Sequence, residues 1–260
     1  MLGLGVFLKT ASPPFLQAMQ LKVFDSYQLY APRTYEAAPV SIVDIDEESL
    51  EKIGQWPWPR DLVSQLVDRI QAGQPLAVGI DIIFAERDRY SPDVLAKRYP
   101  QLPAEAVAGL PDPDQQLAAA LAGPPTVLAV VGLTRLLPGA TQPARPLPVF
   151  SQDIARDRQL PRFVGALTSR PMLESASAGE GLINASSGPL QSNSERGVLR
   201  RVPTIALVND LPFLSLPLEM LRLAVEGAKR NKRRFGLLAR QLHAELVVVQ
   251  FADTLRQLVH

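Results

Sequence analysis

The chain has 260 residues, of which 47% are apolar and 20% charged, a composition typical of a globular protein with a substantial buried core. Its 27 basic and 26 acidic residues leave a net charge of +1, too balanced for a surface that attracts nucleic acid in general. The absence of cysteine excludes disulfides, thiolate nucleophiles and cysteine-based zinc sites, and the two histidines, His243 and His260, offer little to metals that prefer imidazole. We therefore expect no cofactor, no metal ion and no nucleic-acid partner.

The first 30 residues contain an apolar N-terminus and then a helical pattern. MLGLGVFLK is too short for a signal peptide, and no stretch of the chain approaches the ~20 consecutive apolar residues that span a bilayer. Two interpretations of this segment stay open: the stub of a longer hydrophobic helix, or a frayed or core-packed N-terminus. From Ser12 onward, proline and then apolar residues at helical spacing predict a long helix that ends near Tyr30.

A strand, a helix and a second strand follow. VSIVDI at 40–45 is short and rich in β-branched residues, which predicts a buried strand. A one-sided apolar stripe closed by Gly73 predicts an amphipathic helix from about 60 to 72, and LAVGIDIIF at 76–84 predicts the second strand. We expect the two strands to be parallel neighbours joined by a right-handed crossover.

The rest of the chain alternates regular elements with long loops. Proline-rich stretches at 85–113 and 134–161 predict surface loops, while 114–122 reads as a helix and 125–133 as a third strand. Another helix begins after Ser215. The predicted fold class is therefore α/β, with a long N-terminal helix leading into a mixed, partly parallel sheet that is flanked by helices.

Acidic residues gather where the first two strands end. Asp44, Asp46 and Glu47 come at the end of the first strand, and Asp81 lies within the second. Ligand sites of α/β proteins usually lie at this edge of the sheet, so these carboxylates mark a candidate pocket. Asp44 and Asp81 lie inside apolar runs, and because a buried carboxylate needs a partner, we expect an arginine nearby, with Arg60 as the first candidate.

The acidic residues and the WPWPR string each have a structural alternative. Asp46, Glu47 and Glu48 are typical of the charged first turn of a short helix, and the residues favour this interpretation for the two glutamates. Trp56 and Trp58, between prolines, suit either packing or gripping a ligand, and packing is favoured because large aromatic side chains usually bury.

Asn184 and the GVLRR string supply the remaining candidate ligand residues. Side chains alternate along a strand, so Arg200 and Arg201 would lie on opposite faces, and one of them would reach a carboxylate in the pocket. No phosphate-binding glycine loop, GxSxG string or paired His-Glu motif is present, so no catalytic residues are assigned.

Three strings together resemble the CHASE type 2 domain, the extracellular sensor associated with cyclases and histidine kinases. They are VSIVDIDEESLEKIGQWPWPR at 40–60, GIDIIFAERD at 79–88 and SERGVLRRVP at 194–203. The family pattern of a strand ending in an Ile-Asp-Glu turn, a Gly-x-Trp-Pro-Trp-Pro-Arg segment and a Gly-x-Asp-x-x-Phe strand matches these residues. Asn184 and the pair Arg200 and Arg201 resemble later family positions. The resemblance extends from about residue 20 to 225.

The resemblance implies a bacterial, extracytoplasmic input domain of a membrane-bound receptor that detects an unknown small ligand. Its partners would be flanking transmembrane helices, a cytoplasmic cyclase, histidine kinase or Ser/Thr kinase output domain, and a second copy of the chain. The domains expected are a membrane-proximal helix, an α/β sensor core and a basic helical C-terminal segment, at 1–36, 37–226 and 227–260. Two alternatives stay open: a metal-dependent hydrolase that uses the acidic cluster, and a module that only dimerises.

Overall fold

The computed structural model describes residues 14–32, 34, 40–123, 125–138, 141, 143, 160–184, 202–230 and 246–251. The chain divides into two compact units, one of residues 1–38 with 189–198 and one of residues 39–188 with 199–260. In the first unit, the described element is helix α2 (Pro14–Tyr30), as the apolar spacing predicted. Within the described part of the chain, none of the helices combines the length and hydropathy needed to cross a bilayer.

The second unit is built on a mixed sheet that contains the predicted strands. Its strand order is β1 (Val40–Ile45), β9 (Leu246–Phe251), β2 (Ala77–Asp81), β3 (Thr126–Leu133) and β5 (Gly165–Leu167), and β6 (Gly179–Leu182) pairs with β3. All of these pairings are parallel except that of β5 with β3. Parallel strands covered on both faces read as continuous apolar runs, which is the pattern of β2 and β3. The predicted α/β class is confirmed.

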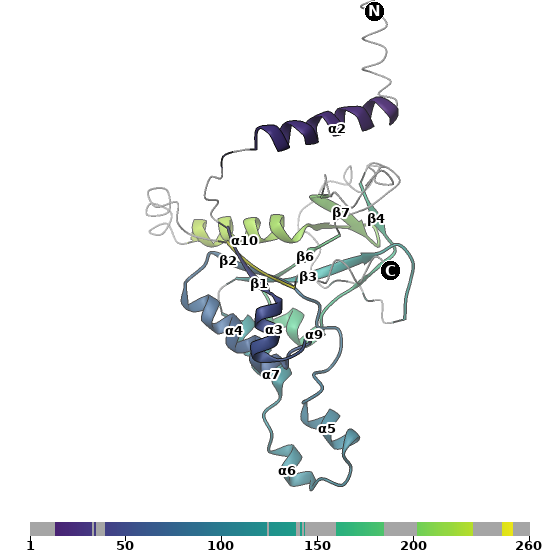
Figure 1. The fold of residues 1–260 in the computed structure, drawn as a ribbon. Coiled ribbons are helices and arrows are strands. Elements are labelled where there is room, and N and C mark those ends of the chain that lie inside the picture. Colours follow the sequence, from purple (N-terminus) through teal and green to yellow (C-terminus); the bar gives the residue numbers. More distant parts are fainter. Residues whose placement is uncertain are drawn as a thin grey trace, which may run out of the picture. The chain divides into compact units, whose positions relative to one another are not determined.

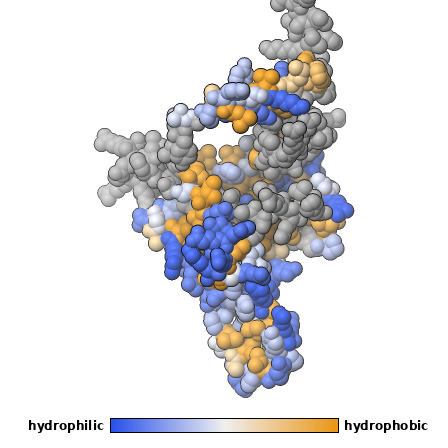
Figure 2. Space-filling view, in the orientation of Figure 1, coloured by the Kyte–Doolittle hydropathy of each residue, from blue (hydrophilic) through white to orange (hydrophobic). Residues whose placement is uncertain are grey.

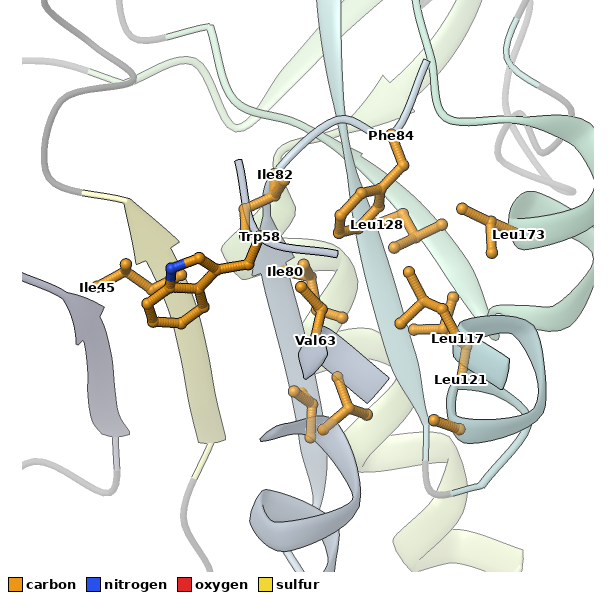
Figure 3. Close-up of a cluster of buried hydrophobic side chains, with 13 residues drawn as sticks. Ile45, Trp58, Val63, Ile80, Ile82, Phe84, Leu117, Leu121, Leu128 and Leu173 are labelled. Carbon is orange, nitrogen blue, oxygen red and sulfur yellow. The ribbon is translucent and has the colours of Figure 1, made fainter. Parts of the chain in front are cut away.

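Helices cover both faces of this sheet (Figure 1). One face carries α4 (Arg60–Ala72), α7 (Pro113–Leu121) and α9 (Pro171–Ala176), and the other carries α10 (Leu216–Arg230). The core under α4 and α7 includes Val63, Ile80 and Leu128 (Figure 3). The core under α10 includes Met220 and Ala77. Because side chains alternate along a strand, even-numbered β2 residues face α4 and odd-numbered ones face α10.

Close backbone packing fixes α10 on its face of the sheet. A Cβ placed on Gly181 of β6 would lie 2.4 Å from the Cα atom of Leu216, the first residue of α10. Only a residue without a side chain allows the helix to approach the strand so closely.

A smaller sheet and a helical insertion complete the unit. The small sheet contains β4 (Arg162–Phe163), β7 (Ile205–Val208) and β8 (Leu211–Leu214), and its Phe163 and Phe213 share a core with β3, β5 and β6 of the main sheet. The insertion follows β2 and carries the short helices α5 (Pro92–Arg98) and α6 (Ala104–Ala108), which project away from the sheet (Figure 1). Apolar residues reach the surface at the end of this projection (Figure 2).

Two expectations about the sheet are wrong. The strands β1 and β2 are parallel, but they are not neighbours, because β9 lies between them. The segment 227–260 was expected to be helical, but its described residues are helical to Arg230, where α10 ends, and form the strand β9 at 246–251, between β1 and β2. Pairing between strands far apart in the sequence leaves no trace in the local pattern that predicted each strand.

Candidate functional site

Asp44 and Asp81 lie in one row across the carboxyl ends of three strands. Both are in register with Gln250 of β9, which separates them. Their neighbours Ile45 and Ile80 belong to the core under α4, so the two aspartates lie on the opposite face, the face that α10 covers over β2. Two strand spacings place them about 10 Å apart, which is too far for two carboxylates to share one cation.

The two aspartates differ in burial. Asp44 is exposed, so the expectation that it is buried is wrong. Asp81 is half-buried, and its Oδ1 atom is fully buried without a hydrogen-bond partner. Burial alone raises the pKa of Asp81 above its ordinary value of 3.8, because a carboxylate loses hydration when it leaves water. Among the described residues, no arginine forms an ion pair with Asp81, so the expected pairing with Arg60 is not found.

Asp46, Glu47 and Glu48 form the start of a short helix, α3 (Glu47–Ile53). The Asp46 carboxylate caps the helix and accepts hydrogen bonds from the Ser49 backbone N–H at 2.9 Å and from the Ser49 hydroxyl at 2.7 Å. These hydrogen bonds lower the pKa of Asp46 below its ordinary 3.8. Glu47 and Glu48 lie in the first turn, where carboxylates interact favourably with the helix dipole. The capping interpretation is confirmed.

The tryptophans of WPWPR pack on the core. Trp58 is buried beside Ile45 (Figure 3), and its ring lies edge-on to Trp56, with 5.9 Å between centroids. The Trp58 indole N–H donates to the carbonyl oxygen of Gly54 at 2.7 Å. Gly54 ends α3 with a φ of 116°, a backbone conformation that favours glycine. The Gly-x-Trp-Pro-Trp spacing thus joins the end of α3 to the start of α4, and the packing interpretation is confirmed for Trp58.

Arg60 pairs with two aspartates that the sequence reasoning missed. Its side chain is 10% exposed, and its Nη1 atom lies 3.0 Å from Oδ1 of Asp114 and 3.9 Å from Oδ2 of Asp88. Its backbone N–H donates to Asp88 Oδ2 at 2.8 Å, and its Nη2 donates to the carbonyl oxygen of Glu86. Arg60 also lies over the Phe84 ring, 5.4 Å from the centroid. The predicted pairing with Asp44 or Asp81 is therefore wrong.

Asp114 is the centre of this group, which we call the arginine cluster: Arg60, Arg87, Arg170, Asp88, Asp112 and Asp114. The Asp114 side chain is fully buried, with Arg87 Nη1 at 3.7 Å and Arg170 Nε at 3.9 Å in addition to Arg60. Ser91 donates to Asp112 Oδ1 at 3.0 Å, and Asp112 also caps the first turn of α7.

The arginine cluster joins four parts of the chain. It connects the first turn of α4 to both ends of the insertion and to the residue before α9. Its carboxylates face guanidinium groups at contact distance, so they are committed to ion pairs within the fold. Asp88 ends the GIDIIFAERD string and Asp112 precedes a proline at a helix start. Those local signals identify a loop and a cap, but not a partner for Arg60.

Asn184 also serves the fold. Its Oδ1 accepts from the Gly132 backbone N–H at 2.7 Å, and its Nδ2 donates to the Gly132 carbonyl at 2.9 Å. The side-chain amide thus acts as one more peptide group between β6 and β3, since it offers one donor and one acceptor in the same plane. Arg200 and Arg201, like the N-terminal MLGLGVFLK, lie outside the described residues.

The candidate residues therefore divide between the two faces of the sheet. Asp44 and Asp81 share the face opposite α4, whereas Arg60 belongs to the arginine cluster at the start of α4. In the part of the chain that the structure describes, no three histidine or carboxylate side chains are grouped to hold a metal ion. Asp81 has a buried Oδ1 atom without a hydrogen-bond partner and belongs to no described ion pair, so this carboxylate has unused capacity to bind.

The raised pKa of Asp81 makes fold stability depend on pH in a predictable direction. The folded state binds the Asp81 proton more tightly than the unfolded state, so the penalty for the buried charge is largest above the folded pKa and disappears below about 3.8. We expect Asp81→Asn to unfold at higher urea concentration than wild type at pH 7, with the gap closing as the pH approaches 3.8.

Urea unfolding of both proteins from pH 7 to pH 4 measures this difference. Asp61→Asn is a matched control, because Asp61 Oδ1 is also buried without a hydrogen-bond partner and the residue lies in the first turn of α4. A gap between Asp81→Asn and wild type that stays constant with pH would contradict the assignment.

Comparison with known proteins gives one match. A model of the CHASE2 domain family matches residues 1–258. Searches of curated proteins and of solved structures gave no match. The matched residues include the whole row of β1, β9 and β2 and every member of the arginine cluster. The chain therefore belongs to the CHASE2 family of extracellular sensory domains.

Proposed function

We propose that the chain is the extracytoplasmic input domain of a membrane-bound bacterial receptor, with a nucleotide cyclase, a histidine kinase or a Ser/Thr kinase as its output. The match of the CHASE2 family over residues 1–258 carries this proposal. Flanking transmembrane helices and the output domain belong to the full-length receptor. In such a receptor the stimulus must bind one arrangement of the domain better than another, since only differential affinity shifts an equilibrium.

We further propose that the ligand binds at the row of Asp44 and Asp81. A half-buried carboxylate with an unsatisfied oxygen recovers a hydrogen bond or an ion pair when a ligand donates to it. The separation of about 10 Å suits an organic molecule with donors at both ends better than a single metal ion, whose oxygen ligands all lie within about 2.6 Å of it. The other described candidate residues then have structural roles in the fold: Asp46, Glu47, Trp56, Trp58, Arg60 and Asn184.

A labelling experiment tests the location. The chain contains no cysteine, so a single introduced cysteine is a unique target within it. In cells that express the full-length receptor, we expect a membrane-impermeant maleimide to label Glu105→Cys, because Glu105 is exposed on α6. Ala166→Cys, at a fully buried position, is the control that reacts only after denaturation. Labelling of Glu105→Cys only after cell lysis would contradict an extracytoplasmic location.

A thermal-shift screen tests the ligand site. We expect a cationic or hydrogen-bond-donating metabolite to raise the melting temperature of wild type, since a ligand that binds only the native state stabilises it. The shift should be lost in Asp44→Asn and in Asp81→Asn, and kept in Glu105→Gln, which removes an exposed carboxylate from the insertion. A hit that both row variants retain would exclude this site. A divalent-metal hit lost in Asp44→Asn would instead favour the hydrolase alternative.

A further inference from the structure

Helix α2 exposes a continuous apolar stripe. The residues at 15, 19, 23, 27 and 30 recur at helical spacing on one side of the helix. Their exposed fractions are Phe15 70%, Met19 48%, Val23 50%, Tyr27 67% and Tyr30 91%. Away from the stripe, Leu21 and Asp25 are partly covered, whereas Phe24 and Gln28 are exposed. Apolar residues of α2 reach the surface in Figure 2.

Such a stripe needs a partner. The helix has 17 residues, and isolated helices of this length are marginal in water because most helix stability comes from packing an apolar face. Exposed aromatic and aliphatic side chains in one contiguous row also mark an association surface. Lys22 and Asp25 are the two charged residues of α2, so the helix lacks the basic face that binds an anionic lipid surface.

The spacing of the stripe fits a second copy of the same helix. Leu16, Met19, Val23, Ser26 and Tyr30 follow the alternating steps of three and four residues that occupy the contact positions of a two-stranded coiled coil. The Ser26 hydroxyl already donates to the Lys22 carbonyl oxygen at 3.0 Å, so its polar atom has a partner when the helices pair. No charged residue lies in this row, so like-charge repulsion does not oppose pairing.

The available area is enough for a weak dimer. At about 200 Å² for each fully exposed aromatic side chain, Phe15, Tyr27 and Tyr30 together expose about 450 Å² per copy. With Met19 and Val23 included, two copies bring together up to roughly 1,200 Å², the lower limit of specific interfaces, when Phe15 and Tyr27 pack along the sides of the contact row. Tethering to a membrane strengthens such a weak contact by raising the effective concentration of one copy near the other.

We propose that α2 is a homodimerisation helix, which pairs in parallel with α2 of a second copy through Leu16, Met19, Val23, Ser26 and Tyr30. The parallel sense rests on the proposed function, because two receptors anchored in one membrane present this helix in the same direction. The pairing itself does not rest on that function, and the two experiments below separate them.

Sedimentation of the full chain tests the pairing. We expect wild type to be a dimer at micromolar concentration, and Val23→Lys to weaken the dimer at least about tenfold because two lysines then meet in the contact row. Gln28→Lys adds the same charge on the side opposite the stripe, where Gln28 is exposed, and should leave the dimer within about twofold of wild type. A monomeric wild type, or a Val23→Lys protein that dimerises like wild type, would overturn the proposal.

Cysteine cross-linking tests the geometry without a destabilising charge. In the cysteine-free chain, Val23→Cys and Tyr30→Cys should each form a disulfide-linked dimer under mild oxidation, and Gln28→Cys should not. Equal cross-linking at all three positions would indicate random collision and overturn the pairing. Cross-linking at Val23, near the helix centre, but not at Tyr30 would indicate antiparallel helices and overturn the parallel sense, while the extracytoplasmic labelling result would stay unaffected.

Discussion

Asp114→Asn is expected to destabilise the fold by about 3–5 kcal/mol, the usual effect of removing one partner of a buried ion pair. The carboxylate is fully buried and lies 3.0 Å from Arg60 Nη1. Its neutralisation leaves a guanidinium group inside the protein with only the more distant Asp88 carboxylate, at 3.9 Å from the same atom. Guanidinium groups stay charged in proteins, so Arg60 cannot relieve the penalty by losing a proton.

Urea unfolding followed by tryptophan fluorescence measures this loss of stability. The fluorescence reports on the region of the arginine cluster, because the two tryptophans of the chain, Trp56 and Trp58, lie just before Arg60. Asp93→Asn is the matched control. Asp93 also pairs with Arg87, but its side chain is 47% exposed, and exposed pairs contribute about 0–1 kcal/mol. Equal effects of the two substitutions would show that the arginine cluster is not a buried network. The double variant Arg60→Met with Asp114→Leu should recover much of the stability.

Gly181→Ala is expected to cost about 1–3 kcal/mol, as overpacking usually does. The new methyl group would lie 2.4 Å from the Cα atom and 2.8 Å from the backbone nitrogen of Leu216. Backbone atoms cannot rotate away as a side chain can, so the first turn of α10 must move off β6.

Gly227→Ala is the control with the opposite sign. Gly227 lies within α10, and a methyl group there meets no atom within 4 Å, so the substitution should stabilise the helix by up to about 1 kcal/mol. In calorimetry, the melting temperature of Gly181→Ala should therefore be lower than that of wild type, and that of Gly227→Ala should be higher. A Gly181→Ala protein that melts with wild type would mean that α10 is not fixed on the sheet by this contact.

The local elements could be predicted well because short-range patterns determine them. The strand at 40–45 and the helix at 60–72 have the bounds that β-branched content and the apolar stripe predicted. The cap role of Asp46 also follows from residues within three positions of it. In each case the interaction that determines the local structure is between residues close together in the sequence.

Long-range partners could not be predicted in the same way. The sequence predicted that Arg60 pairs with a buried carboxylate, but its contacts to Asp88 and Asp114 depend on how the insertion returns to the sheet. LVVVQF at 246–251 has the composition of a strand, yet nothing local places it between β1 and β2. The sequence predicted that Asp44 and Asp81 lie at the same edge of the sheet. It did not show that they face away from α4 and therefore from Arg60, because that depends on which side of each strand packs against the helix.

The position of β9 between β1 and β2 also determines when this unit can finish folding. A ribosome releases β1 and β2 long before Leu246–Phe251, so the gap between these two strands stays open until β9 has been made. Closing it joins residues far apart in the sequence, which is the kind of contact that slows folding. During synthesis, two unpaired strand edges, including the apolar run of β2, are available to other chains. The nascent domain is therefore most open to association with other chains in the interval before β9 is inserted between β1 and β2.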